Sequence, residues 1–202
     1  LTGTFDSFLR FLKMGSVLKG CNAYKTKGTP VLDLFRQLFL LVFTHKTLFT
    51  AIRSGKITTA SKDTFYRFLN SEHINWSRFT RMLAVRLIGV FSRLTGKDRV
   101  NVLIIDDTSY ERGRAQKVEL LSNIFDHCKH QYKLGFRLLT LGWSDGNSFL
   151  PIDSVLLASQ KEGNRLQEAK GLDKRTAGYK RRQLSLGGAP AAAFEMVRSA
   201  QT

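Results

Sequence analysis

The sequence has 202 residues, of which 43% are hydrophobic, and its 32 lysines and arginines against 16 acidic residues give a formal net charge of +16. This length allows a packed core of one or two domains, and so much positive charge points to an anionic partner such as nucleic acid. No apolar run approaches the roughly 20 residues of a membrane-spanning helix. The two cysteines, Cys21 and Cys128, exclude a disulfide framework and favour a reducing cytoplasm.

The first 99 residues predict a basic helical region. Apolar residues recur at helical spacing from Phe5 to Leu12, and Pro30 precedes a second helical segment over residues 31–44. Further helices are expected over residues 61–70 and from residue 75 or 77 to residue 94, closed by Gly96. The region carries a net charge of +12. We therefore expect residues 1–99 to be a DNA-binding leader.

The pattern changes to that of strands at residue 100. Residues 100–105 form a β-branched and aliphatic run that is typical of a strand buried on both faces. Residues 134–143 and 148–158 predict two more strands, joined by a tight turn at Asp145-Gly146. Residues 160–187 are polar and basic without a clear period, so we expect a loop there, followed by a helix over residues 189–200.

Two adjacent carboxylates, Asp106 and Asp107, follow the first predicted strand, and Thr108 and Ser109 come directly after them. A carboxylate at the end of a buried strand is costly without a partner or a metal, and Mg²⁺ prefers carboxylate oxygen. Alternation along a strand directs only one of the two toward a given site. The residues alone leave two readings open, a metal ligand or an aspartate that caps a turn.

The segment from Ile105 to Ser159 resembles the start of the catalytic domain in DDE transposases of bacterial insertion sequences, close to insertion-sequence family four. The likeness lies in the order of its tracts, which are IDDTS, the Gly-Phe start of the next strand, the Trp-Ser-Asp-Gly turn and the proline of the third strand. SKDTFYRFLNSEHINWSRF resembles the helical leader of these proteins, and GYKRRQLSL resembles their basic connector. The resemblance extends over roughly residues 55–200.

This resemblance implies an α/β fold, with a helical N-terminal region followed by the first half of an RNase H-like domain, three strands and a helix, over residues 100–202. It also implies two-metal phosphoryl transfer with Mg²⁺ or Mn²⁺, held by two aspartates and a glutamate. Asp107 matches the first aspartate, and Asp106 is the runner-up that the same pattern would direct into the core. We expect the second aspartate and the glutamate to lie beyond Thr202, in a longer protein, and this chain by itself to be unable to cut DNA.

Basic residues on the predicted helices and connector are the candidate contacts to DNA. The helices predicted over residues 61–70 and 75–95 could form a helix-turn-helix, although two helices that only pack together have the same sequence pattern. Lysine and arginine beside tyrosine in the connector suit phosphate contacts. The candidates are Arg78, Arg81, Arg86, Lys180, Arg181 and Arg182.

Other patterns favour no competing chemistry. His127, Cys128 and His130 are too closely spaced for a standard zinc site, and Tyr110 lies too early for a tyrosine recombinase. Transposon ends and target DNA are the expected partners, with a homodimer on DNA and a location at the bacterial nucleoid. The alternatives are a non-catalytic DNA-binding remnant of a transposase and a basic protein that binds a membrane surface.

Overall fold

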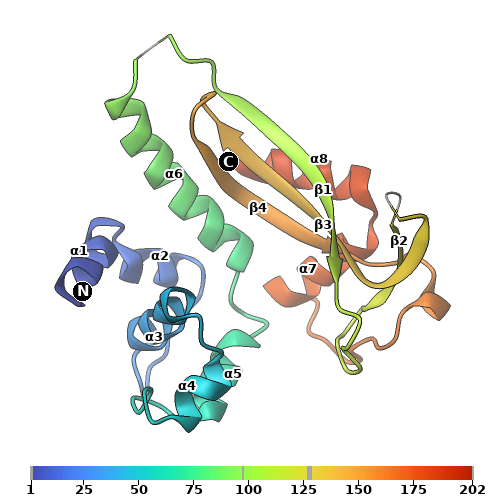
Figure 1. Cartoon of the computed structure of the whole chain (residues 1–202), viewed down its shortest axis with the longest axis horizontal. Coiled ribbons are helices and arrows are strands. Elements are labelled where there is room, and N and C mark those ends of the chain that lie inside the picture. The colour runs from blue at the N-terminus through green and yellow to red at the C-terminus, as the bar shows by residue number, and fades with distance from the viewer. Residues whose placement is uncertain (1, 97, 127–128, 202) are drawn as a thin grey trace. The chain divides into compact units, whose positions relative to one another are not determined.

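The computed structural model describes residues 2–96, 98–126 and 129–201 and divides them into two compact units, Leu1–Phe79 and Thr80–Thr202 (Figure 1). The division falls inside one long helix, α6 (Trp76–Leu94), twenty residues before the sequence pattern changes to strands. The C-terminal part of that helix therefore belongs to the unit that contains the sheet. None of the described helices combines the length and the apolarity that crossing a bilayer requires.

The first unit is helical, as expected. Thr47 and Ser61 each accept a hydrogen bond from the backbone N–H three residues later, and Asn75 does the same for Arg78, which fixes where three helices begin. The predicted helices over residues 31–44, 61–70 and 75–94 are confirmed to within a residue or two. The helices are α1 (Thr2–Phe11), α2 (Met14–Gly20), α3 (Val31–Thr44), α4 (Leu48–Arg53), α5 (Lys62–Leu69) and the start of α6.

Aromatic rings stabilise the packing of this unit. The rings of Phe35 and Phe39 on α3 stack at 5.8 Å between centroids, and Phe35 also contacts Phe79 at the start of α6. Phe68 meets Trp76 edge to face at 5.5 Å. Such pairs stabilise the packing beyond the burial of apolar area. Because aromatic rings prefer particular orientations, they also restrict the angles at which these short helices meet.

The second unit is built on an antiparallel sheet of four strands, β1 (Val102–Glu111), β2 (Ser122–Asp126), β3 (Gln131–Ser144) and β4 (Phe149–Leu157). The long central strand β3 pairs with β1 along one edge and with β2 and then β4 along the other. The three predicted strands are present, but β2 was not predicted. It has only five residues, and its Asn123 interrupts the apolar pattern.

Residues 160–187, predicted to be a loop, contain helix α7 (Ala177–Leu186) and a short 3-10 helix, η1 (Glu162–Asn164), so this prediction is wrong in part. The Thr176 side chain accepts a hydrogen bond from the Tyr179 N–H at the start of α7, and the Ser185 carbonyl accepts one from the Ala158 N–H just after β4. Tertiary contacts thus form a helix that the polar sequence does not indicate. The last helix, α8 (Ala189–Ala200), is where the sequence predicts it.

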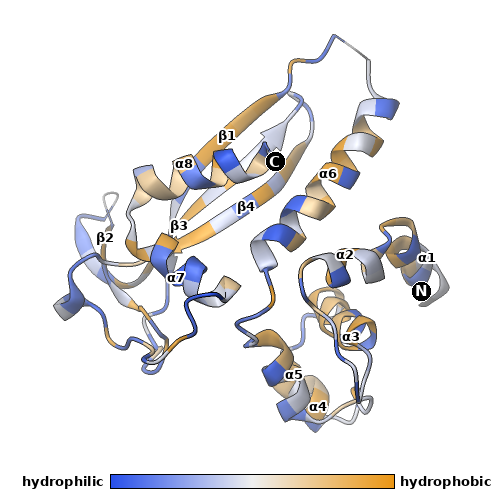
Figure 2. Cartoon of the chain, turned by 180° about the vertical axis from the view of Figure 1, so that it is seen from behind, coloured by the Kyte–Doolittle hydropathy of each residue, from blue (hydrophilic) through white to orange (hydrophobic). Residues whose placement is uncertain are grey.

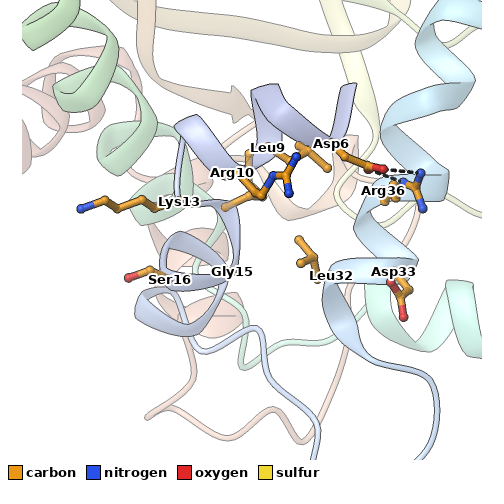
Figure 3. A pocket seen from close by; sticks show the side chains of 10 residues that line it. Asp6, Leu9, Arg10, Lys13, Gly15, Ser16, Leu32, Asp33 and Arg36 are labelled. Atoms are coloured by element: carbon orange, nitrogen blue, oxygen red, sulfur yellow. Dashed lines mark hydrogen bonds and ion pairs between the residues drawn. The ribbon is translucent and has the colours of Figure 1, made fainter. Parts of the chain in front are cut away.

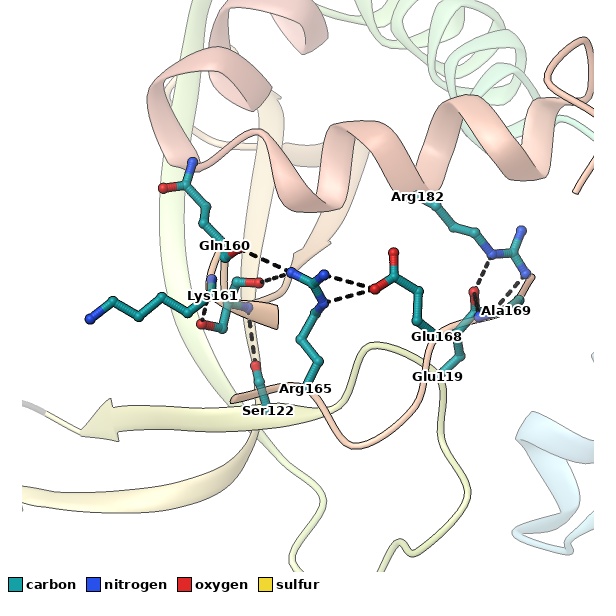
Figure 4. Close-up of polar contacts among 9 residues, drawn as sticks. Glu119, Ser122, Gln160, Lys161, Arg165, Glu168, Ala169 and Arg182 are labelled. Carbon is teal, nitrogen blue, oxygen red and sulfur yellow. Dashed lines mark hydrogen bonds and ion pairs between the residues drawn. The ribbon is translucent and has the colours of Figure 1, made fainter. Parts of the chain in front are cut away.

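Side-chain contacts also order the rest of the segment before α7 (Figure 4). The Arg165 guanidinium donates to the carbonyls of Ser159 and Gln160 at 3.0 and 3.1 Å and to the Glu168 carboxylate at 2.7 Å. Backbone hydrogen bonds join Leu120 to Gln167 and Leu166 to Leu121, alongside β2. The segment is therefore bound to the residues that precede β2 and to those that follow β4.

Helix α8 covers one face of the sheet, as Figures 1 and 2 show from opposite sides. The core on that face unites β3 and β4 with α8, and side chains of α6 pack against it. Its fully buried members include Leu141 and Ala192. The buried set is Ala84, Leu139, Leu141, Trp143, Ile152, Val155, Leu157, Ala192 and Met196.

Strand β1 differs from the prediction of a strand buried on both faces. It begins two residues later than predicted and extends to Glu111, and each of its ten residues is exposed. Ile104 and Ile105 keep 41% and 44% of their surface accessible. The reason is that β1 pairs only with β3 in the described part of the chain, and the helices of the core pack on β3 and β4. The prediction of burial is wrong because an apolar sequence does not say whether neighbours are present.

The predicted tight turn between β3 and β4 is confirmed. Gly146 adopts a φ of 88°, which favours glycine, and the Asp145 carboxylate accepts hydrogen bonds from the N–H groups of Asn147 and Ser148. Arg99 donates to the same carboxylate at 2.7 Å. The Arg99 guanidinium, with help from these backbone donors, lowers the pKa of Asp145 to about 2.

Candidate active site

The two candidate aspartates lie within β1 and not at its end. Asp106 is opposite Thr140 and Asp107 is opposite Leu139 on β3, and four more residues of β1 follow them. Cross-strand partners in an antiparallel pair project from the same face of the sheet. The position of each aspartate can therefore be read from its partner.

Asp107 projects from the face that α8 covers, because Leu139 belongs to the core on that face. Asp106 projects from the opposite face, where Thr108 donates a hydrogen bond to it at 3.2 Å. The argument that Asp106 would point into the core is therefore wrong, because the alternation runs the other way. Asp107 is still not buried in this core, since β1 lies beside the part of the sheet that the helices cover.

Arg137 is the immediate partner of Asp107. The two side chains form an ion pair across β1 and β3, with 27% of the aspartate and 51% of the arginine side chain accessible. Arg137 lies two residues from Leu139 along β3, so it is on the same face as Asp107. This contact was not predicted, because the register that brings residues 30 apart together is not visible in the sequence.

The described residues supply only part of a metal site. No three of their histidine, cysteine, aspartate or glutamate side chains come together in a way that could hold an ion. Magnesium usually keeps several waters and takes one or two carboxylates together with substrate phosphates. Asp107 fits the role of one such ligand, because its carboxylate is accessible, with the Arg137 guanidinium as its present partner.

A family model described as DDE superfamily endonuclease matches residues 39–190, about three quarters of the chain. The chain belongs to the DDE superfamily endonucleases. The match includes all four strands, both candidate aspartates and the basic helix α7. No curated protein and no solved structure matches the chain.

Membership of this family indicates a nuclease of the transposase type, with DNA as the implied substrate. Enzymes of this superfamily typically use divalent metal ions. The predicted fold class is confirmed in outline. Helices come first, an antiparallel α/β domain follows, and the arrangement is consistent with an RNase H-like DDE domain.

Several cations proposed for DNA make ion pairs within the endonuclease. Arg81 on α6 contacts the buried carboxylate of Asp153 at 2.6 Å, and Arg181 on α7 contacts the same carboxylate at 3.3 Å. Arg182 donates to Glu119 at 2.7 Å (Figure 4). Arg81 and Arg181 join their helices to β4, and Arg182 joins α7 to the segment before β2. This role is sufficient reason for their presence.

The remaining candidates are distributed over both units. Arg78 and Lys180 are exposed, and Arg86 is half-buried on α6. Their contact with DNA stays a prediction. His127 and Cys128 of the disfavoured zinc pattern lie outside the described residues, whereas the His130 ring lies against Phe125.

The first unit of the endonuclease contains a cavity of about 510 Å³ between α1, α2 and α3. Figure 3 shows Arg10 and Lys13 along its wall, with the Asp6–Arg36 ion pair, 2.9 Å long, bridging α1 and α3. Asp33 adds a second carboxylate to the lining. Charges of both signs line this cavity, so it has no marked preference for an anion or a cation.

Proposed function

We propose that the chain acts in DNA transposition, as the endonuclease of a bacterial insertion sequence close to insertion-sequence family four. The observation that carries the proposal is the family match, which includes the strand of Asp106 and Asp107. The accessible carboxylate of Asp107, on a strand that pairs with the central strand β3, supports the same conclusion. The reaction is metal-dependent phosphoryl transfer to water or to a DNA 3′-hydroxyl.

Asp107 is the proposed metal ligand, and Asp106 is the runner-up. A bound Mg²⁺ or Mn²⁺ would supply activation of the attacking oxygen and stabilisation of the leaving oxygen. Asp107 would hold the ion through its carboxylate, which Arg137 orients. A DNA phosphate is a natural second partner for Arg137, because guanidinium binds phosphate as readily as carboxylate.

The unpaired edge of β1 suits the rest of the proposed site. Within residues 2–96, 98–126 and 129–201, β1 pairs on one side only. The resemblance places the second aspartate of the family on a fourth strand, after the three that it matches here. A strand paired with this edge would bring its carboxylate next to Asp107.

The proposal has a second form in which the chain binds DNA without cutting it. The net charge of +16 and the exposed Arg78 and Lys180 support DNA binding in either form. A homodimer on DNA and a location at the nucleoid belong to both forms.

The test is strand cleavage of transposon-end DNA in Mg²⁺ by the protein from its complete reading frame. We expect Asp107→Asn to abolish cleavage while the Kd for DNA is kept, and Glu162→Gln, which changes an exposed carboxylate, to leave cleavage intact. Full activity of Asp107→Asn with loss in Asp106→Asn would assign the role to the other aspartate. A wild-type protein that binds the DNA but never cuts it would leave only the binding form.

A further inference from the structure

Aromatic rings gather on one face of the sheet at the β2–β3 hairpin. Phe125 on β2 and Tyr132 on β3 are cross-strand partners whose ring centroids are 5.2 Å apart. Tyr132 keeps 74% of its surface accessible. The ring of His130 lies 6.5 Å from that of Phe125. Large exposed rings at a hairpin are costly in water unless a partner covers them.

A second aromatic group lies on the same face. Tyr110 on β1 is opposite Phe136, and the Arg112 guanidinium lies 5.8 Å from the centre of the Tyr110 ring. Since residues 132, 134 and 136 of β3 alternate to one face, Tyr132 and Tyr110 project from the same side of the sheet. Four residues along β3 separate the two groups by about 13 Å. We call Tyr110, Arg112, Phe125, His130 and Tyr132 the aromatic platform.

The charges around the platform favour an anion. Three acidic side chains nearby already have a cation, since Lys133 pairs with Asp126 at 2.8 Å and with Glu111, and Arg182 pairs with Glu119. The carboxylates of Asp126 and Glu111 raise the pKa of Lys133 above its usual range. Asp106 lies four residues from Tyr110 on the same face of β1. Within the described residues, four exposed cations of the same segments form no ion pair with a carboxylate. They are Arg112, Arg114, Lys117 and Lys129.

We propose that the aromatic platform binds single-stranded DNA by stacking unpaired bases on Tyr132 and Tyr110. Exposed rings interleaved with arginine and lysine are the surface that binds an unpaired strand, because every base has a face that can stack. Duplex DNA does not offer those faces. The two groups are far enough apart to take different bases of one strand. The choice of DNA over RNA rests on the proposed function.

The platform is separate from the proposed metal ligand. Asp106, Thr108 and Tyr110 lie on one face of β1, whereas Asp107 projects from the other face. Binding of an unpaired strand and metal-dependent cleavage can therefore be lost independently. A variant of Asp107 should leave the platform unchanged.

The experiment is fluorescence anisotropy of a labelled oligo-thymidine in EDTA, where no cleavage occurs. We expect Tyr132→Ala and Tyr110→Ala each to raise the Kd at least about fivefold, since one stacked base contributes that much or more. Tyr132→Phe should retain wild-type affinity because it keeps the ring. The matched controls are Tyr24→Ala and Phe194→Ala, which remove exposed rings elsewhere and should leave the Kd unchanged.

Circular dichroism of each variant shows whether it is folded, and Arg112→Ala, which removes a cation but no ring, provides a second measure. Equal weakening of single-stranded and duplex DNA by Tyr132→Ala would overturn the proposal in favour of general electrostatic binding. An unchanged Kd in both tyrosine variants would also overturn it and would make a protein the better candidate occupant. Asp107→Asn with unchanged oligo-thymidine binding separates this result from the test of cleavage.

Discussion

The carboxylate of Asp107 has two possible partners, the Arg137 guanidinium, which contacts one of its oxygens, and a divalent ion. The ion pair is half-exposed, so its contribution is small, about 0.2–1 kcal/mol. Arg137 therefore orients the carboxylate without excluding a metal. A DNA phosphate that attracts Arg137 would make metal binding easier.

Arg137→Ala tests this competition. We expect the variant to bind Mn²⁺ more tightly by a factor of roughly two to five, which is the free energy of an exposed ion pair expressed as an affinity ratio. Isothermal titration with Mn²⁺ measures the change, and the double variant with Asp107→Asn should lose the gain. Weaker Mn²⁺ binding by Arg137→Ala would show that the arginine supports the site instead of competing with the ion.

Asp145 makes the stability of the second unit depend on pH. Its pKa is lowered to about 2 in the folded protein, chiefly by Arg99, from an ordinary value of 3.8. The stabilisation is therefore present above pH 4 and is lost as the pH falls through about 2. We expect Asp145→Asn to lower the midpoint of urea unfolding at pH 7, and the difference from wild type to shrink between pH 4 and pH 2. A difference that is constant over this range would contradict the role of the ionised carboxylate.

At the scale of the strands, Gly135 is the residue that lets β1 pair closely with β3. A Cβ at this position would lie 2.4 Å from the Tyr110 carbonyl oxygen, which belongs to the backbone and cannot turn away. Gly163, in contrast, has open space around it. The glycine that starts the predicted second strand thus has a steric reason to be there.

We expect Gly135→Ala to lower the free energy of unfolding by about 1–3 kcal/mol, as overpacking typically does. Urea unfolding followed by circular dichroism measures it, and Gly163→Ala should change little. A Gly135→Ala variant as stable as wild type would mean that β1 can move away from β3 at no cost.

The elements that the sequence predicted correctly have local signals. Helices α3, α5 and α8 have a capping residue or an early proline and a helical period, and the Asp145-Gly146 turn has its characteristic pair. Strand β2, helix α7 and the exposure of β1 depend on which segments lie beside them, so no local pattern shows them. The partnership of Asp107 with Arg137 depends on register in the same way.

At the scale of the whole molecule, positive charge is spread over a helical unit and a sheet unit, and a carboxylate lies on the most exposed strand of the sheet. Several arginines of the basic helices are engaged by buried or half-buried carboxylates, so the net charge overstates how many cations can meet DNA. The family match and this arrangement together support a DNA-cutting enzyme, and the metal-binding role of Asp107 is our proposal for it.

Paramagnetic broadening of amide NMR signals by Mn²⁺ tests that central claim most directly, because it locates a weakly bound ion without requiring catalysis. We predict that the signals of Asp107, Arg137 and Leu139 broaden first, and that Asp107→Asn removes the effect while Asp106→Asn leaves it in place. Broadening that persists in Asp107→Asn and vanishes in Asp106→Asn would contradict the assignment of Asp107 as the metal ligand.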